Sequence, residues 1–101
     1  MMNAGGFRVS PLEVEAALGT APGIGSIGVT QVQIKTDVNV IAAFYTADTP
    51  LDEDALQRYA QGKLARYKQP RLFVHLPALP QGANGKLLRR ALRETFEADA
   101  K

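Results

Sequence analysis

Apolar residues recur at helical spacing in three stretches of the chain, and the first of these begins near Pro11. Ser10 is predicted as the N-cap of this helix, with the proline at the first helical position. Glu13 lies three residues after Ser10, which is the spacing of a capping box. Gly19 is a helix stop signal, so we expect one short helix over residues 11–18.

The second and third helices are predicted from longer apolar stripes. The second follows Asp52 as N-cap and is expected to end before Pro70. Its predicted buried face consists of Leu56, Tyr59, Ala60, Leu64 and Tyr67. The third helix is expected from about Lys86 to Glu97. Its predicted buried stripe consists of Leu88, Leu92 and Phe96.

Alternating apolar positions predict three strands. In the first, Ile27–Ile34, the inward-facing phase changes near Thr30–Gln31, which indicates a bulge or a strand break. The second, Val38–Tyr45, is apolar on both sides and is expected at the centre of the sheet. The third is Arg71–Leu76. The order α-β-β-α-β-α predicts an α+β domain, in which a small antiparallel sheet of about three strands is covered by about three helices.

Composition agrees with one globular domain over residues 1–101, because 46% of the residues are hydrophobic and 22% are charged. The chain has no cysteine, which excludes disulfides, thiolate nucleophiles and zinc fingers within it. The single histidine, His75, is predicted in a strand, and no metal site is expected. The longest apolar run, Val40–Tyr45, is too short to span a membrane, and the start of the chain lacks the features of a signal peptide. We therefore expect a cytoplasmic location.

The net charge of +2 conceals a strong asymmetry along the chain. Residues 55–93 carry nine positive charges and no acid, whereas the remainder carries ten acids and three bases. A basic half of this kind indicates an anionic partner, such as a nucleotide, a coenzyme phosphate or a nucleic acid. A solvated helix face is the favoured interpretation for three of these residues, which are Arg89, Arg90 and Arg93.

Lys86 is the most notable candidate for chemistry. It follows Asn84 and Gly85 in a segment rich in proline and glycine, where the backbone is able to approach a ligand closely. A phosphate-binding Walker motif does not fit, because it requires glycine at position 80 and serine or threonine at position 87. The chain has Pro80 and Leu87 at these positions.

Three segments carry distinctive motifs: GGFRVSPLEVE at 5–15, LARYKQPR at 64–71 and LPQGANGKLLRR at 79–90. In this order and spacing they resemble the C-terminal domain of adenylate-forming enzymes, the AMP-binding or acyl-CoA synthetase superfamily. The resemblance covers nearly the whole chain, from about Gly5 to Arg93. It implies a C-terminal lid domain of an acid–CoA ligase, with residues 1–4 as the truncated end of an interdomain hinge and residues 94–101 as a C-terminal tail.

The resemblance also implies a two-step reaction. A carboxylate attacks the α-phosphate of ATP, which gives an acyl-adenylate and pyrophosphate, and the thiol of coenzyme A then displaces AMP. ATP and coenzyme A are the implied substrates, with Mg²⁺ accompanying ATP in the N-terminal domain and none of them bound by this domain alone. The implied partners are that N-terminal AMP-binding domain and a small carboxylic acid, and no nucleic acid is expected. Without the N-terminal domain the chain is expected to catalyse neither step.

By the motif match, Lys86 is the lysine that reaches into the adenylation site. The residues that would support its segment are Pro80, Asn84 and Gly85. The residues that match the loop lining the thiol tunnel, or that would meet the nucleotide or coenzyme, are Gly5, Gly6, Phe7 and Arg8. Glycine suits a narrow tunnel for pantetheine, because a side chain would block it.

Two other interpretations remain open from the sequence. A small basic α+β domain could bind nucleic acid or a protein without catalysis, which the charge asymmetry favours. Against this, aromatic residues are few, and Tyr59 and Tyr67 are predicted on a buried helix face, where they could not stack on bases. The same lid domain could instead serve a pantetheine thiol on a carrier protein.

Overall fold

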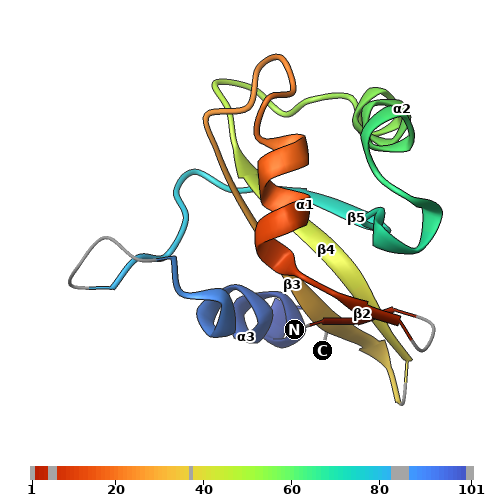
Figure 1. The fold of residues 1–101 in the computed structure, drawn as a ribbon. Helices are drawn as coiled ribbons and strands as arrows, with labels where there is room; N and C mark the ends of the chain where they lie inside the picture. Colours follow the sequence, from red (N-terminus) through yellow and green to blue (C-terminus); the bar gives the residue numbers. More distant parts are fainter. Residues whose placement is uncertain (1, 5–6, 37, 83–86, 100–101) are drawn as a thin grey trace.

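The main sheet has three strands in the order β3–β4–β5 (Figure 1). The computed structural model describes residues 2–4, 7–36, 38–82 and 87–99. The strand bounds are Ser26–Lys35 for β3, Val38–Thr46 for β4 and Leu72–His75 for β5. β3 and β4 form an antiparallel hairpin, whereas β5 pairs with β4 in parallel. The helix between β4 and β5 provides the crossover that a parallel pair requires. The α+β class and the predicted order of the main elements are confirmed, and β5 is the one departure from antiparallel pairing in this sheet.

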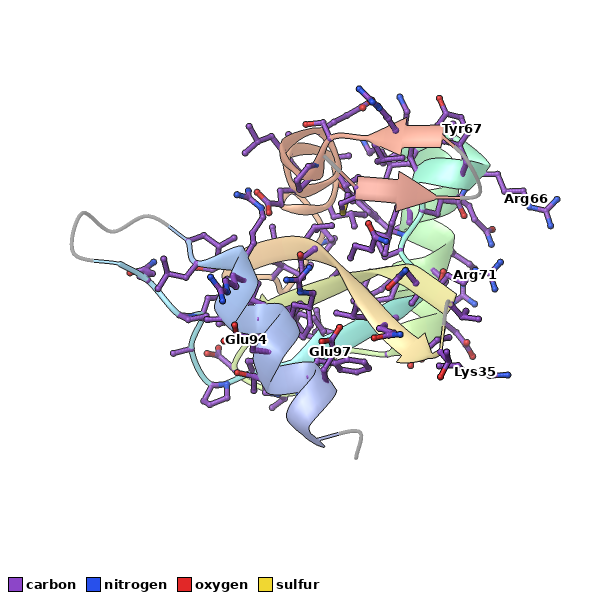
Figure 2. The ribbon with its side chains drawn as sticks, turned by 90° about the horizontal axis from the view of Figure 1, so that it is seen from below. Lys35, Arg66, Tyr67, Arg71, Glu94 and Glu97 are labelled. Carbon is purple, nitrogen blue, oxygen red and sulfur yellow. The ribbon has the colours of Figure 1, made fainter. Side chains whose placement is uncertain are left out.

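Helices cover both faces of the sheet. Their bounds are Pro11–Leu18 for α1, Glu53–Lys63 for α2 and Arg89–Asp99 for α3. Successive residues of β4 face opposite layers: Ile41 and Ala43 join the core beneath α1 and α2, whereas Ala42 and Phe44 pack with Leu92 of α3. Figure 2 shows α1 and α3 on opposite sides of the sheet. Because the central strand is buried on both faces, its sequence is apolar at consecutive positions.

The irregularity predicted near Thr30–Gln31 is wrong. Pairing between β3 and β4 continues through this position, and the register shift lies between Gln33 and Lys35. Val29 and Val32 are both fully buried, but they belong to core clusters on opposite faces of the sheet. The apolar residues of β3 therefore change from one side of the strand to the other because both faces of the sheet are covered.

α1 begins at Pro11 as predicted, with Ser10 at the N-cap position, but the predicted capping box does not form. The Ser10 side chain makes no capping hydrogen bond. Glu13 instead accepts a hydrogen bond from the Lys68 ammonium at 2.7 Å. A partner distant in the sequence has displaced the local one.

α2 begins as predicted, because the Asp52 carboxylate accepts a hydrogen bond from the Asp54 backbone N–H at 3.2 Å. The helix ends at Lys63, well before the proline that was expected to end it. Leu64 is extended, with φ of −129° and ψ of 147°, and its side chain enters the core. Gln69 Nε2 donates to the Leu64 carbonyl at 3.1 Å, which satisfies a group that the helix leaves open.

A short 3-10 turn, η1 (Arg66–Lys68), follows α2. Tyr67 in this turn is 39% exposed, so its predicted burial on the helix face is wrong. It was this burial that argued against stacking of Tyr67 on a base, so that argument is wrong as well. Lys68 lies over the Tyr67 ring at 5.6 Å from its centroid.

α3 begins at Arg89, three residues later than predicted, because Leu87 pairs with Gln81 in an isolated β-bridge and so lies outside the helix. Leu88 is 43% exposed, so its predicted place in the buried stripe is wrong. Leu87 packs into the core in its place. Leu92 and Phe96 face the sheet as predicted.

A second, small sheet that the sequence pattern did not indicate precedes α1. β1 (Met2–Ala4) pairs antiparallel with β2 (Phe7–Val9). Met2 and Val9 are buried in the cluster that includes the inner face of α1. Residues 2–4, expected as the end of a hinge, form a strand of the domain in this structure.

Candidate functional site

Two parts of these motifs, the β1–β2 pair around Gly5 and Gly6 and the segment around Lys86, are framed in separate places. The β1–β2 pair and the segment between β5 and α3 lie on opposite sides of the molecule (Figure 1). Five candidate residues lie outside the described ranges: Gly5, Gly6, Asn84, Gly85 and Lys86. The structure shows the framework on either side of these residues.

The segment that contains Lys86 is closed at its base by backbone bonds. Gln81 and Leu87 pair in an antiparallel bridge. Next to it, the Leu88 N–H donates to the Pro80 carbonyl at 3.0 Å. Pro80 is half-buried and lies within this base. The two ends of the intervening stretch are thereby held side by side.

Leu87 is accommodated at this base by Gly28, a glycine near the start of β3. A Cβ atom at Gly28 would lie 2.7 Å from one Leu87 methyl carbon and 2.9 Å from a Leu92 methyl carbon, which is closer than real contacts allow. The absence of a side chain at Gly28 leaves room for these two leucines in their present positions. Sequence reasoning missed Gly28, although a glycine inside a strand is a recognised sign of close approach by another part of the chain.

The first residue of α3 forms an ion pair across the layers. Arg89 donates to Glu15 of α1 through Nη2 to Oε1 at 2.6 Å and through Nε to Oε2 at 3.1 Å. Glu15 Oε2 also accepts from the Val29 backbone N–H of β3 at 2.8 Å. The interpretation of Arg89 as part of a solvated face is therefore wrong. Arg90 is exposed and pairs only locally, with Glu94 at 2.9 Å.

On the other side of the molecule, Phe7 and Arg8 lie in β2 and pair with Ala4 and Asn3 of β1. Arg8 is exposed. The antiparallel pairing fixes the backbone on both sides of the two glycines, and the buried Val9 ties β2 to the core.

Several basic residues belong to this same side. Arg66, Arg71 and Lys35 point outward along one side of the molecule, the side on which the β1–β2 pair also lies (Figures 1 and 2). Lys68 is engaged by Glu13, and this hydrogen bond raises the pKa of the Lys68 ammonium above its ordinary value. The basic half of the sequence is thus divided between exposed cations and cations bound to acids.

His75 occupies β5 as predicted, with its Nε2 2.9 Å from the Ala47 carbonyl oxygen. Within the described ranges, no group of three or more histidine, cysteine, aspartate or glutamate side chains is arranged to hold a metal ion. None of the helices in the described part of the chain is long and apolar enough to cross a membrane.

The chain resembles known proteins along almost its whole length. Residues 13–86 match the family model described as the AMP-binding enzyme C-terminal domain. The 2-succinylbenzoate–CoA ligase of Bacillus licheniformis is 39% identical over 89 residues, which cover 88% of this chain and 19% of the ligase.

Solved structures agree with this match. A fatty acyl CoA synthetase of Mycobacterium tuberculosis has a TM-score of 0.89 and 31% identity, covering 98% of this chain and 20% of that one. ATP-bound MatB from Rhodopseudomonas palustris has a TM-score of 0.87 and 28% identity, covering 100% of this chain and 20% of that one. The chain therefore spans about a fifth of the length of the proteins it matches.

Proposed function

The chain belongs to the family of AMP-binding enzyme C-terminal domains, and from this membership we propose that it acts as the lid domain of an ATP-dependent acid–CoA ligase. The ligase activates a carboxylic acid as its acyl-adenylate and then transfers the acyl group to the thiol of coenzyme A. An N-terminal domain of the same enzyme holds ATP, with its Mg²⁺, and the acid. The names of the similar proteins, a 2-succinylbenzoate–CoA ligase and a fatty acyl CoA synthetase, support this reaction class.

The observation that carries the proposal is the separation of two parts of these motifs, one on each side of the Glu15–Arg89 contact. The segment between β5 and α3 and the β1–β2 pair lie on opposite sides of the molecule (Figure 1). In any one orientation, only one of these sides is able to face an active site on another domain. Using both therefore requires the domain to turn between the two half-reactions, as lids and domains commonly do.

We assign the first half-reaction to the side that bears Lys86. Adenylation brings an anionic carboxylate toward an anionic phosphate, and an ammonium group there stabilises the charge that converges in the transition state. At ~3 Å and an effective dielectric constant of ~20, the attraction is about 5 kcal/mol before desolvation. Pro80, Asn84 and Gly85 belong to the segment that delivers this lysine, and Pro80 stands in its hydrogen-bonded base.

We assign the second half-reaction to the side that bears Gly5 and Gly6. These residues and Phe7 line the path of the pantetheine arm, which is too narrow for side chains at the glycine positions. Arg8 is exposed beside this path. Arg66 and Arg71 point outward on the same side and supply positive charge for the phosphates of coenzyme A (Figure 2).

The test uses the enzyme that carries this domain and a matched protein that ends before it. Acid-dependent release of pyrophosphate from ATP, and thioester formation with coenzyme A, are measured for both proteins. We expect both reactions in the whole enzyme and neither in the truncated one. Equal activity in the two proteins would contradict the proposal. Salt-sensitive binding of nucleic acid by a protein that activates no acid would favour the basic binding module instead. Transfer to a carrier-protein pantetheine, with none to coenzyme A, would change only the acceptor.

A further inference from the structure

The lysine segment is anchored to one strand at two adjacent positions. Leu87 packs against Gly28 of β3, and Arg89 reaches the Val29 backbone through Glu15. These anchors are two residues apart on the chain that follows Lys86. The two anchors contact β3 from opposite faces of the sheet. Leu87 lies in the core cluster on the α3 face, whereas Glu15 comes from α1 on the other face.

The Glu15 carboxylate accepts three hydrogen bonds, two from Arg89 and one from Val29. Only 14% of the Glu15 side chain is exposed, against 31% for Arg89. Two parallel bonds between a guanidinium and a carboxylate fix direction as well as distance. β3 is an edge strand of its sheet, so the bond to Val29 also occupies an N–H group on that strand.

Other ion pairs nearby lack these features. Glu13, on the same helix as Glu15, makes a single bond to Lys68, and its side chain is 49% exposed. Glu94, on the same helix as Arg89, pairs with Arg90 at an exposed site within one helix. Only the pair between Glu15 and Arg89, of these three, ties the end of the lysine segment to two other elements.

We propose that the Glu15–Arg89 pair, joined to the Val29 N–H, is a positioning device that sets the direction in which the Lys86 segment leaves the domain. The role rests on the proposed function, since it concerns the delivery of the adenylation lysine. Neither residue touches the reacting atoms. The pair acts through the first turn of α3 and the base formed at Leu87 and Leu88.

The experiment compares Glu15→Gln and Arg89→Gln with the controls Glu13→Gln and Glu94→Gln in the enzyme that carries this domain. We expect the first two variants to slow adenylation at saturating ATP by about 10- to 100-fold, because misplacement by about 1 Å has effects of that size. Thioester formation from supplied acyl-adenylate should change less than threefold. Both controls should keep wild-type rates in both half-reactions.

Two further variants separate positioning from general stability. Arg89→Lys keeps the charge and loses the two-pronged contact, so its adenylation rate should lie between those of wild type and Arg89→Gln. The double variant Glu15→Gln with Arg89→Gln should be no slower than the worse single variant, because the two side chains act as one unit.

Hydrogen exchange supplies a readout that does not depend on activity. The Leu88 and Val29 amides each donate one of the bonds described above, so peptides that contain them should exchange faster in Glu15→Gln and Arg89→Gln and at wild-type rates in the controls. Unchanged exchange, unchanged adenylation, or equal losses in both half-reactions would overturn the positioning role while the wild-type enzyme remains active. A wild-type enzyme that forms no acyl-adenylate would overturn the proposed function and this role with it.

Discussion

The two motif-bearing sides of the domain are held in different ways. The lysine side is closed at its base by backbone bonds and is held further by side chains: Leu87 fills the space above Gly28 of β3, and Arg89 of α3 binds Glu15 of α1. The glycine side is fixed by backbone pairing of β1 with β2 and by the burial of Met2 and Val9 in the core. Side-chain substitutions around the lysine side should therefore change the first half-reaction, whereas the second should respond mainly to substitutions at Gly5 and Gly6.

The largest expected effect comes from Lys86→Ala. Removal of the ammonium should slow adenylation by about 1,000-fold or more, because the charge that it stabilises develops in the transition state. Thioester formation from supplied acyl-adenylate should be largely kept. Pyrophosphate release and thioester formation are measured separately, and equal losses in the two would remove the assignment of Lys86 to one side.

Gly6→Leu should show the opposite pattern, with thioester formation reduced by about 100-fold and adenylation retained, because the side chain obstructs the thiol path. Gly62→Leu is the matched control, since a Cβ atom added at Gly62 would meet no atom within 4 Å. It should leave both half-reactions unchanged. A Gly6→Leu enzyme that transfers acyl groups to coenzyme A at the wild-type rate would argue against a tunnel on this side.

Gly28→Val sharpens the comparison through the packing on the lysine side. Its side chain would collide with Leu87 and Leu92, and we expect the free energy of unfolding to fall by about 1–3 kcal/mol. In the folded enzyme, adenylation should be slowed more than thioester formation. Denaturant unfolding measures the first effect, with Gly62→Ala as a control that should be neutral or slightly stabilising. Normal stability in Gly28→Val would show that Leu87 is free to move away.

Glu13→Gln should have the smallest effect. Glutamine is still able to accept from the Lys68 ammonium, but loss of the negative charge weakens this hydrogen bond and removes the ion pair, so the pKa of Lys68 should return toward about 10.5. The Lys68 pKa is raised by folding, so the pair stabilises the native state at neutral pH, and its contribution disappears as the pH rises through the Lys68 pKa. NMR titration of Lys68 tests the shift, and the stabilities of wild type and variant should converge only in strongly alkaline solution. Convergence already near pH 8 would contradict this origin.

The sequence pattern predicted those elements whose signals are local. Asp52 caps α2 because its carboxylate and the N–H that it binds are two residues apart. The central position of β4 followed from apolar residues at consecutive positions. The errors come from partners distant in the sequence. Glu13 turns to Lys68, 55 residues away, and leaves the capping box unformed.

The candidate site shows the same division. Lys86 and the two glycines are candidates because their neighbours in sequence form motifs, and their roles stay predictions. The bonds that hold their framework join residues far apart: Glu15 and Arg89 are separated by 74 positions. The apolar spacing predicts Leu88 as the buried residue, whereas Leu87 is the one that packs into the core. The reason is the β-bridge between Leu87 and Gln81, which makes α3 begin later than predicted. Periodicity within one helix contains no information on such contacts.

The central claim, that opposite sides of this domain face the active site in turn, is tested most directly by cysteine protection in the whole enzyme. The chain contains no cysteine, and Leu88 and Arg8 are exposed on the two sides, so Leu88→Cys and Arg8→Cys each report on one side. With a non-reactive acyl-adenylate analogue bound, the cysteine at 88 should be protected from alkylation and the cysteine at 8 accessible. With AMP and the thioester product bound, the order should reverse. Protection of both cysteines in the same state, or of neither in both states, would contradict the account.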